Sequence, residues 1–209
     1  MNLAQLVVNC IKENIRNDDT TLNVENLLNG NLDQSPDYAV DVNNVLLSIN
    51  KAISRLQTAK KIPLRSTTLV GVPNESIYDI SHIKDIRKIV SVYVIKNGRP
   101  YWVGWNWISE GNIFIGFGFN GNIYLQYEKK IPNFMEADIQ NTDVDLEETY
   151  GLDDELCNYI AYFAKSELYE RVDQDRCKRY LNYFEQFVNE IDRREAVVYQ
   201  DHVQAKYKW

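Results

Sequence analysis

The chain has 209 residues, of which 44% are hydrophobic and 25% charged, and its formal net charge is -7. It is long enough to bury one core but short for a two-domain enzyme. An acidic chain without a cluster of basic residues is not expected to bind DNA tightly, because nucleic-acid affinity comes largely from clustered lysine and arginine.

The chain is expected to be soluble. No apolar run approaches the ~18 residues of a membrane span. The apolar N-terminal stretch from Leu3 to Ile11 has no positively charged region before it, so it is not predicted to be a signal peptide. Three cysteines, Cys10, Cys157 and Cys177, fall in helical patterns without paired spacing, which predicts reduced thiols rather than a disulfide framework or a zinc site.

Two amphipathic helices are predicted before the middle of the chain. Apolar residues recur at three- and four-residue steps from Leu3 to Ile15 and again from Val42 to Leu56. Asp37 or Asp41 is expected to cap the second helix, and Pro63 to end it.

Residues 64–130 change to β-branched and aromatic residues that suit strands. Ile86 to Ile95 predicts one strand, and Asn97-Gly98 predicts a hairpin to a second strand from Tyr101 to Trp107. Further turns separate strands at Ile113–Phe119 and Ile123–Glu128. The pattern predicts an antiparallel meander.

The C-terminal third predicts two more helices. Residues 131–150 are expected to be an acidic, irregular link, and Asp153 to cap the first helix. Neither helix pair has enough apolar surface to fold well alone, so the two pairs are expected to pack together. The predicted fold class is α+β. One domain over 1–209 would hold an antiparallel helical bundle (1–62 and 151–194), an inserted antiparallel β-sheet (64–130) and an extended C-terminal tail (195–209).

Two motifs resemble ligand-binding sequences, but the residues around them do not fit such a site. Gly116 to Gly121 matches a dinucleotide fingerprint, but a strand is predicted next where that fold needs a helix. The acidic run Asp143 to Glu148 fails the spacing of an EF-hand in either register, so it is interpreted as a solvated loop.

No cofactor, metal or catalytic residue is predicted. The two histidines, His82 and His202, lie far apart, and no nucleophile elbow, zinc pair or phosphate loop is present. A glycosidase using only carboxylates is disfavoured because no deep-pocket architecture is expected. The chain is therefore predicted not to be an enzyme.

Four aromatic residues, Tyr101, Trp102, Trp105 and Trp107, mark a candidate interface with neighbouring subunits or a tail-side protein. Alternation favours core packing for Trp105 and Trp107. A platform for binding sugar is the third interpretation.

The last residues form a second candidate binding segment. A chain end is usually disordered, yet this one is apolar enough to order on a partner. Its candidate residues are Val197, Val198, Tyr199, Val203, Tyr207 and Trp209.

The order of these segments resembles head–tail adaptor (connector) proteins of tailed bacteriophages, which form a ring beneath the portal. The resemblance covers most of residues 1–194 and rests on Leu46 to Ile53, Ser76 to Ile80, Gly121 to Glu128 and Leu156 to Leu168. The long loop from Asp18 to Asp37 departs from the compact start typical of such adaptors.

The resemblance implies a structural virion protein without catalytic residues. Its partners would be the portal protein, tail or nozzle proteins, and further copies of itself in a ring of about twelve. Genomic DNA would pass through the ring without sequence-specific binding. Assembly would take place in the host cytoplasm, and the tail segment would bind the portal. Another tail or baseplate component, or a carbohydrate-binding module, is the alternative.

Overall fold

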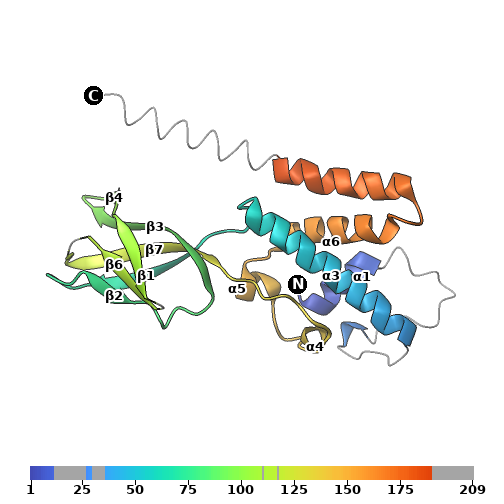
Figure 1. Ribbon diagram of the computed structural model, residues 1–209, viewed down its shortest axis with the longest axis horizontal. Coiled ribbons are helices and arrows are strands. Elements are labelled where there is room, and N and C mark those ends of the chain that lie inside the picture. Colours follow the sequence, from blue (N-terminus) through green and yellow to red (C-terminus); the bar gives the residue numbers. More distant parts are fainter. Residues whose placement is uncertain (12–26, 30–35, 110, 117, 190–209) are drawn as a thin grey trace. The chain divides into compact units, whose positions relative to one another are not determined.

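The computed structural model describes residues 1–11, 27–29, 36–109, 111–116 and 118–189, and it is a mixed α+β structure with antiparallel sheets (Figure 1). This confirms the predicted class. The chain forms two compact units: a helical unit of Met1–Ile62 with Asn133–Trp209, and a β unit of Pro63–Pro132. None of the described helices has the length and apolar character needed to cross a membrane.

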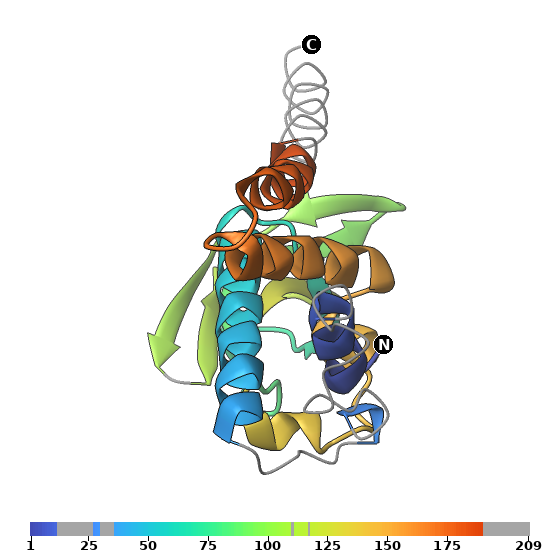
Figure 2. The same ribbon diagram turned by 90° about the vertical axis from the view of Figure 1, so that its right-hand side faces the viewer.

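The helical unit is organised around α1 (Leu3–Ile11), α3 (Pro36–Thr58) and α6 (Asp154–Tyr169). All three contact one another, and α6 lies across α1 and α3 (Figure 2). The predicted apolar stripes are confirmed by burial as far as they are described; Ile15, the last residue of the first stripe, lies outside the described residues. The side chains concerned are Leu3, Leu6, Val7, Cys10 and Ile11 of α1, and Val42, Val45, Leu46, Ile49, Ile53 and Leu56 of α3.

Both ends of α3 differ from the prediction. The helix begins at Pro36, so Asp37 and Asp41 lie inside it and do not cap it. Proline suits a first helical turn, where its missing N–H would have no helical partner. At the other end, Lys60 has a left-handed backbone with φ of 57°, and the Lys61 N–H donates to the Leu56 carbonyl at 2.9 Å. This turn ends the helix before Pro63.

The acidic residues 133–150 belong to the helical unit and are not an irregular link. They contain α4 (Glu136–Ile139) and α5 (Leu146–Tyr150). Asp145 caps α5 by accepting from the backbone N–H groups of Glu147 and Glu148 at 2.8 and 3.0 Å. Such short helices span barely one turn, which is too little for a helical period to be visible in the sequence.

A further helix over residues 174–189 packs beside α6 (Figure 1). The Asp153 carboxylate accepts from the Leu156 N–H at 2.8 Å, so the predicted cap of α6 is confirmed. Tyr159 stacks on Phe187 while Tyr169 stacks on Tyr180, so the two helices run antiparallel. Phe184 and Phe187 are the only buried side chains over 174–189.

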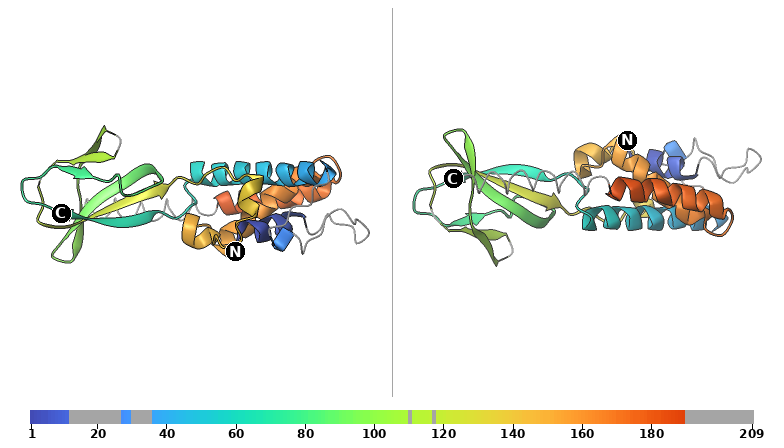
Figure 3. Two further views of the ribbon diagram at one scale, coloured as in Figure 1. Left: turned by 90° about the horizontal axis from the view of Figure 1, so that it is seen from below. Right: turned by 90° about the horizontal axis from the view of Figure 1, so that it is seen from above.

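Two antiparallel sheets form the β unit (Figure 3). One has the order β1 (Arg65–Gly71), β7 (Gly121–Lys129), β3 (Ile86–Lys96), β4 (Arg99–Trp102); the other has the order β2 (Ile77–Asp79), β6 (Asn112–Ile115), β5 (Trp105–Ser109). Their inner residues share one apolar core, with Leu69, Val92 and Leu125 from the first sheet and Tyr78, Ile113 and Ile115 from the second.

The predicted hairpin at Asn97-Gly98 is confirmed, with β3 paired to β4 and positive φ angles of 50° and 73° in the turn. The predicted meander is wrong, because β7 pairs with β3 and β1 rather than with β6. Hydrophobic periodicity sets which face of a strand is buried, but it does not choose the neighbouring strand.

The predicted strand from Tyr101 to Trp107 is also wrong, because it is two strands in different sheets. The chain crosses between the sheets at Val103-Gly104, where the Val103 N–H donates to the Val92 carbonyl at 2.8 Å and the Gly116 N–H donates to the Gly104 carbonyl at 3.2 Å. Val103 is 6% exposed and belongs to the shared core. The burial of Val103 in this core marks the point where the aromatic run passes from one sheet to the other.

Candidate interaction surface

The aromatic residues predicted as an interface lie on two sheet edges. β4 and β5 are each the outermost strand of their sheet, so among the described strands each has a neighbour on one side only. The exposed fractions are 49% for Tyr101, 63% for Trp102 and 48% for Trp107. Large aromatic side chains with this exposure on open sheet edges are typical of a surface that another molecule covers.

Trp105 and Trp107 share one face of β5. Their register partners, Ile115 and Ile113, are both buried, so both indoles start from the core side of the strand. The two rings meet edge to face with centroids 6.3 Å apart. Trp105 packs against the core as alternation predicts, whereas Trp107 stays half exposed at the edge.

A row of side chains on the outer face of the larger sheet was not predicted. Register places Thr68 beside Tyr124, Tyr124 beside Tyr93, and Tyr93 beside Trp102, across all four strands. The rings of Tyr93 and Tyr124 stack with centroids 5.2 Å apart. Each tyrosine lies between two apolar residues in sequence, so alternation could have placed it outward, but only the register brings it to Trp102.

The glycine-rich segment from Gly116 to Gly121, at the start of β7, allows two backbone segments to approach closely. As predicted, a strand follows it. A Cβ on Gly118 would lie 2.4 Å from the Asn74 backbone nitrogen, so this position admits only glycine. Close approach of two backbone segments therefore accounts for this glycine, and no bound phosphate is needed to explain it.

The acidic residues act chiefly at helix starts. Besides capping α5, the Asp145 carboxylate lies 3.0 Å from the Met1 ammonium. Hydrogen bonds from the Glu148 backbone N–H and the Met1 ammonium lower the pKa of Asp145 below its ordinary value. Over the described residues no three His, Cys, Asp or Glu side chains gather as potential metal ligands.

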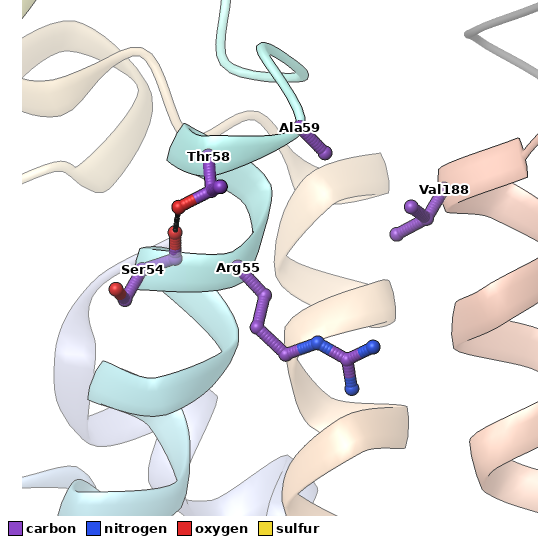
Figure 4. A pocket seen from close by; sticks show the side chains of 5 residues that line it. All are labelled: Ser54, Arg55, Thr58, Ala59 and Val188. Atoms are coloured by element: carbon purple, nitrogen blue, oxygen red, sulfur yellow. Dashed lines mark hydrogen bonds between the residues drawn. The ribbon is translucent and has the colours of Figure 1, made fainter.

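A pocket of about 280 Å³ lies between α3 and the helix over 174–189, lined by Ser54, Arg55, Thr58, Ala59 and Val188 (Figure 4). Arg55 pairs with Glu185. Its guanidinium lies 5.2 Å from the ring centroids of both Phe163 and Phe184. Arg55 therefore joins three helices, and it is the only charged group in the lining.

The six tail residues predicted to bind a portal, from Val197 to Trp209, lie outside the described residues, as does His202. His82 is exposed in the β unit. The chain matches no protein-family model and none of the curated proteins.

Proposed function

We propose that the chain is a structural virion protein, the head–tail adaptor of a tailed bacteriophage. About twelve copies would form a ring that joins the portal vertex of the capsid to the tail and surrounds the passing DNA without sequence-specific binding. The exposure of Tyr101, Trp102 and Trp107 on two sheet edges is the observation that carries the proposal. Aromatic residues are enriched in protein interfaces, and an uncovered edge is a liability for a protein that stays single.

The proposal gives each segment a task. Residues 1–62 and 151–194 form the antiparallel helical bundle of the ring body, and the inserted β unit presents its edge strands to neighbouring copies or to tail or nozzle proteins. The tail residues Val197, Val198, Tyr199, Val203, Tyr207 and Trp209 bind the portal. The protein is assembled in the host cytoplasm and resides at the head–tail interface of the virion.

Attachment would depend on many weak contacts acting together. Burial of one large apolar side chain contributes about 1.5–3 kcal/mol before ordering costs. A closed ring presents the same tail segment many times to a portal that is itself a ring, so avidity strengthens a weak individual contact.

The test is to mix the purified protein with portal particles and count bound rings by electron microscopy. The intact chain should bind, and a variant without residues 196–209 should not. Trp102→Ala should leave portal attachment in place but weaken ring closure or tail joining, whereas Val172→Ala, at an 82% exposed site in the helical unit, is the matched control. Normal attachment of the truncated chain would refute the tail's role, and failure of the intact chain to attach would refute the adaptor.

A carbohydrate-binding module is the second candidate, favoured by one observation. The outer row of Tyr124, Tyr93 and Trp102 lies beside polar side chains, including Ser91, whose hydroxyl donates to the side-chain amide oxygen of Gln126 at 2.7 Å. Specific glycan binding that Trp102→Ala abolishes would favour this module. Attachment to tail or baseplate proteins without a portal would favour another tail component.

A further inference from the structure

The two units carry opposite charge. The β unit holds eight Lys and Arg against five Asp and Glu, a formal charge of +3. The helical unit holds 15 Lys and Arg against 25 Asp and Glu, a formal charge of -10. The net charge of the chain conceals this division.

The cations of the β unit gather at one end of the larger sheet. Register brings Ile86 beside Lys129 and Lys88 beside Glu128, and the Lys130 N–H donates to the Asp85 carbonyl at 2.6 Å. Six cations therefore lie around one strand end, with Asp85 and Glu128 as the accompanying acids. The six are Arg65, Lys84, Arg87, Lys88, Lys129 and Lys130. Glu128 already pairs with Arg87 at 3.1 Å.

The same end also exposes apolar side chains. Leu64 precedes β1 and is 43% exposed, and Val90 of β3 is 43% exposed at a bulge. Apolar side chains ringed by cations suit an interface in which burial supplies affinity and charge selects the partner.

One stretch of the helical unit has the complementary charge, and its exposed residues are called the acidic surface below. Residues 133–164 contain nine Asp and Glu and no Lys or Arg. The Met1 ammonium is a cation paired within it, 3.0 Å from Asp145 and 3.7 Å from Asp154. Three of these carboxylates accept from backbone N–H groups around α4, α5 and α6: Asp138, Asp145 and Asp153. Met135, at the start of this surface, is 67% exposed, so an apolar side chain accompanies the acids here as well.

We propose that the cationic end of the β unit docks onto the acidic surface of residues 133–164 in a second copy of the chain. Contact between unlike units is attractive, while contact between two helical units or two β units is repulsive. In a head-to-tail contact of this kind, one copy keeps its acidic surface uncovered and the other keeps its cationic end uncovered. Further copies can therefore add until a ring closes. The inference rests on the ring assembly of the proposed function and names the surfaces that form it.

The experiment is a charge swap followed by sedimentation velocity at low ionic strength. One variant carries Lys84→Glu, Lys88→Glu and Lys130→Glu, and the other carries Asp143→Lys, Glu148→Lys and Glu155→Lys. All six side chains are exposed. The intact chain should associate with rising concentration, and each variant alone should need about tenfold more protein or remain a monomer. In the mixture of the two variants, the unchanged acidic surface of the first variant faces the unchanged cationic end of the second, so pairs should form. The two altered surfaces are both acidic, with formal charges of -2 and -3, so the pairs should not grow further.

High salt should weaken association of the intact chain and of the mixture alike, since the Debye length falls to about 3 Å at 1 M salt. The control is Arg171→Glu with Lys178→Glu and Arg179→Glu, which changes the net charge by the same amount as the β-unit variant, at exposed sites outside both surfaces. It should associate as the intact chain does. Circular dichroism on every variant checks that it folds.

Three results would overturn the inference: an intact chain that stays monomeric at every concentration, a β-unit reversal that associates normally, or a mixture that forms no pairs. If the cationic end attracted the acidic surface of its own chain, the intact chain would stay monomeric. Portal binding does not enter the measurement. Self-association without portal attachment would therefore contradict the proposed adaptor function but agree with the inferred contact. Portal attachment without self-association would contradict the inferred contact but agree with the adaptor function.

Discussion

At the scale of single residues, two indoles three positions apart in sequence have different environments. Trp105 packs against the shared core of the β unit, whereas Trp102 is 63% exposed on the outer face of the larger sheet. We expect Trp105→Ala to lower the free energy of unfolding by about 2–3 kcal/mol, less than for a fully buried indole. Trp102→Ala should cost less than about 1 kcal/mol. Urea unfolding measures both, and equal costs would contradict the assignment.

The three thiols should differ in reactivity. Burial raises the pKa of Cys10 and that of Cys157 to about 12, so neither forms thiolate at neutral pH. Cys177 is half-buried near the start of the helix over 174–189. We expect a thiol reagent to label Cys177 alone in the native protein and all three thiols in denaturant, as counted by mass spectrometry. Fast native labelling at Cys10 would show that α1 is not packed as described.

At the scale of elements, α5 depends on a charge pair at its start. The hydrogen bond to Asp145 raises the pKa of the Met1 ammonium, and the pKa of Asp145 is lowered. A raised pKa of a cation stabilises the fold below pH ~8 and loses that contribution as pH rises further. A lowered pKa of an acid stabilises the fold above pH ~4 and loses that contribution as pH falls.

The contribution of this pair to stability should therefore be complete between about pH 4 and pH 8 and fall on either side, so the difference in stability between the parent chain and Asp145→Asn should be largest within that range. Thermal unfolding across this range measures the effect. Asp143→Asn, at an exposed acid outside α5, is the control and should keep the profile of the parent chain.

The start of α4 is held to α3 by one side chain. The Asn50 amide donates to the Phe134 carbonyl at 2.9 Å, and its oxygen accepts from the Phe134 N–H at 2.8 Å. Asn50→Ala removes both bonds and leaves two backbone groups unpaired, so we expect a loss of about 1–3 kcal/mol. Asn43→Ala on the exposed side of the same helix should change stability little. Similar denaturation midpoints for the two variants would contradict this role.

At the scale of the whole molecule, the β unit has its own core and the chain enters and leaves it at Pro63 and Pro132. A separately expressed fragment of residues 63–132 should therefore fold, although a domain of this size is only marginally stable. Circular dichroism should show β structure with a cooperative thermal transition. The same fragment with Trp105→Ala should melt at a lower temperature, and a fragment without a transition would show that the β unit needs the rest of the chain.

Local pattern was enough for the α+β class, the Asn97-Gly98 hairpin, the apolar stripes of α1 and α3 and the Asp153 cap. These features depend on side-chain periodicity, backbone conformation and capping within a few residues, which the sequence records directly. The division of charge between the two units could also have been counted from the sequence once their bounds were known.

Only the tertiary structure decided which strands are neighbours. Strand pairing joins residues far apart in the chain, as when β1 and β3 flank β7, and alternation is equally compatible with several such pairings. Burial of Val103 split a continuous aromatic run between two sheets, leaving Trp105 against the core and Trp102 in a row with Tyr93 and Tyr124. Composition selected the aromatic residues of the candidate surface, but packing decided which of them another molecule can reach.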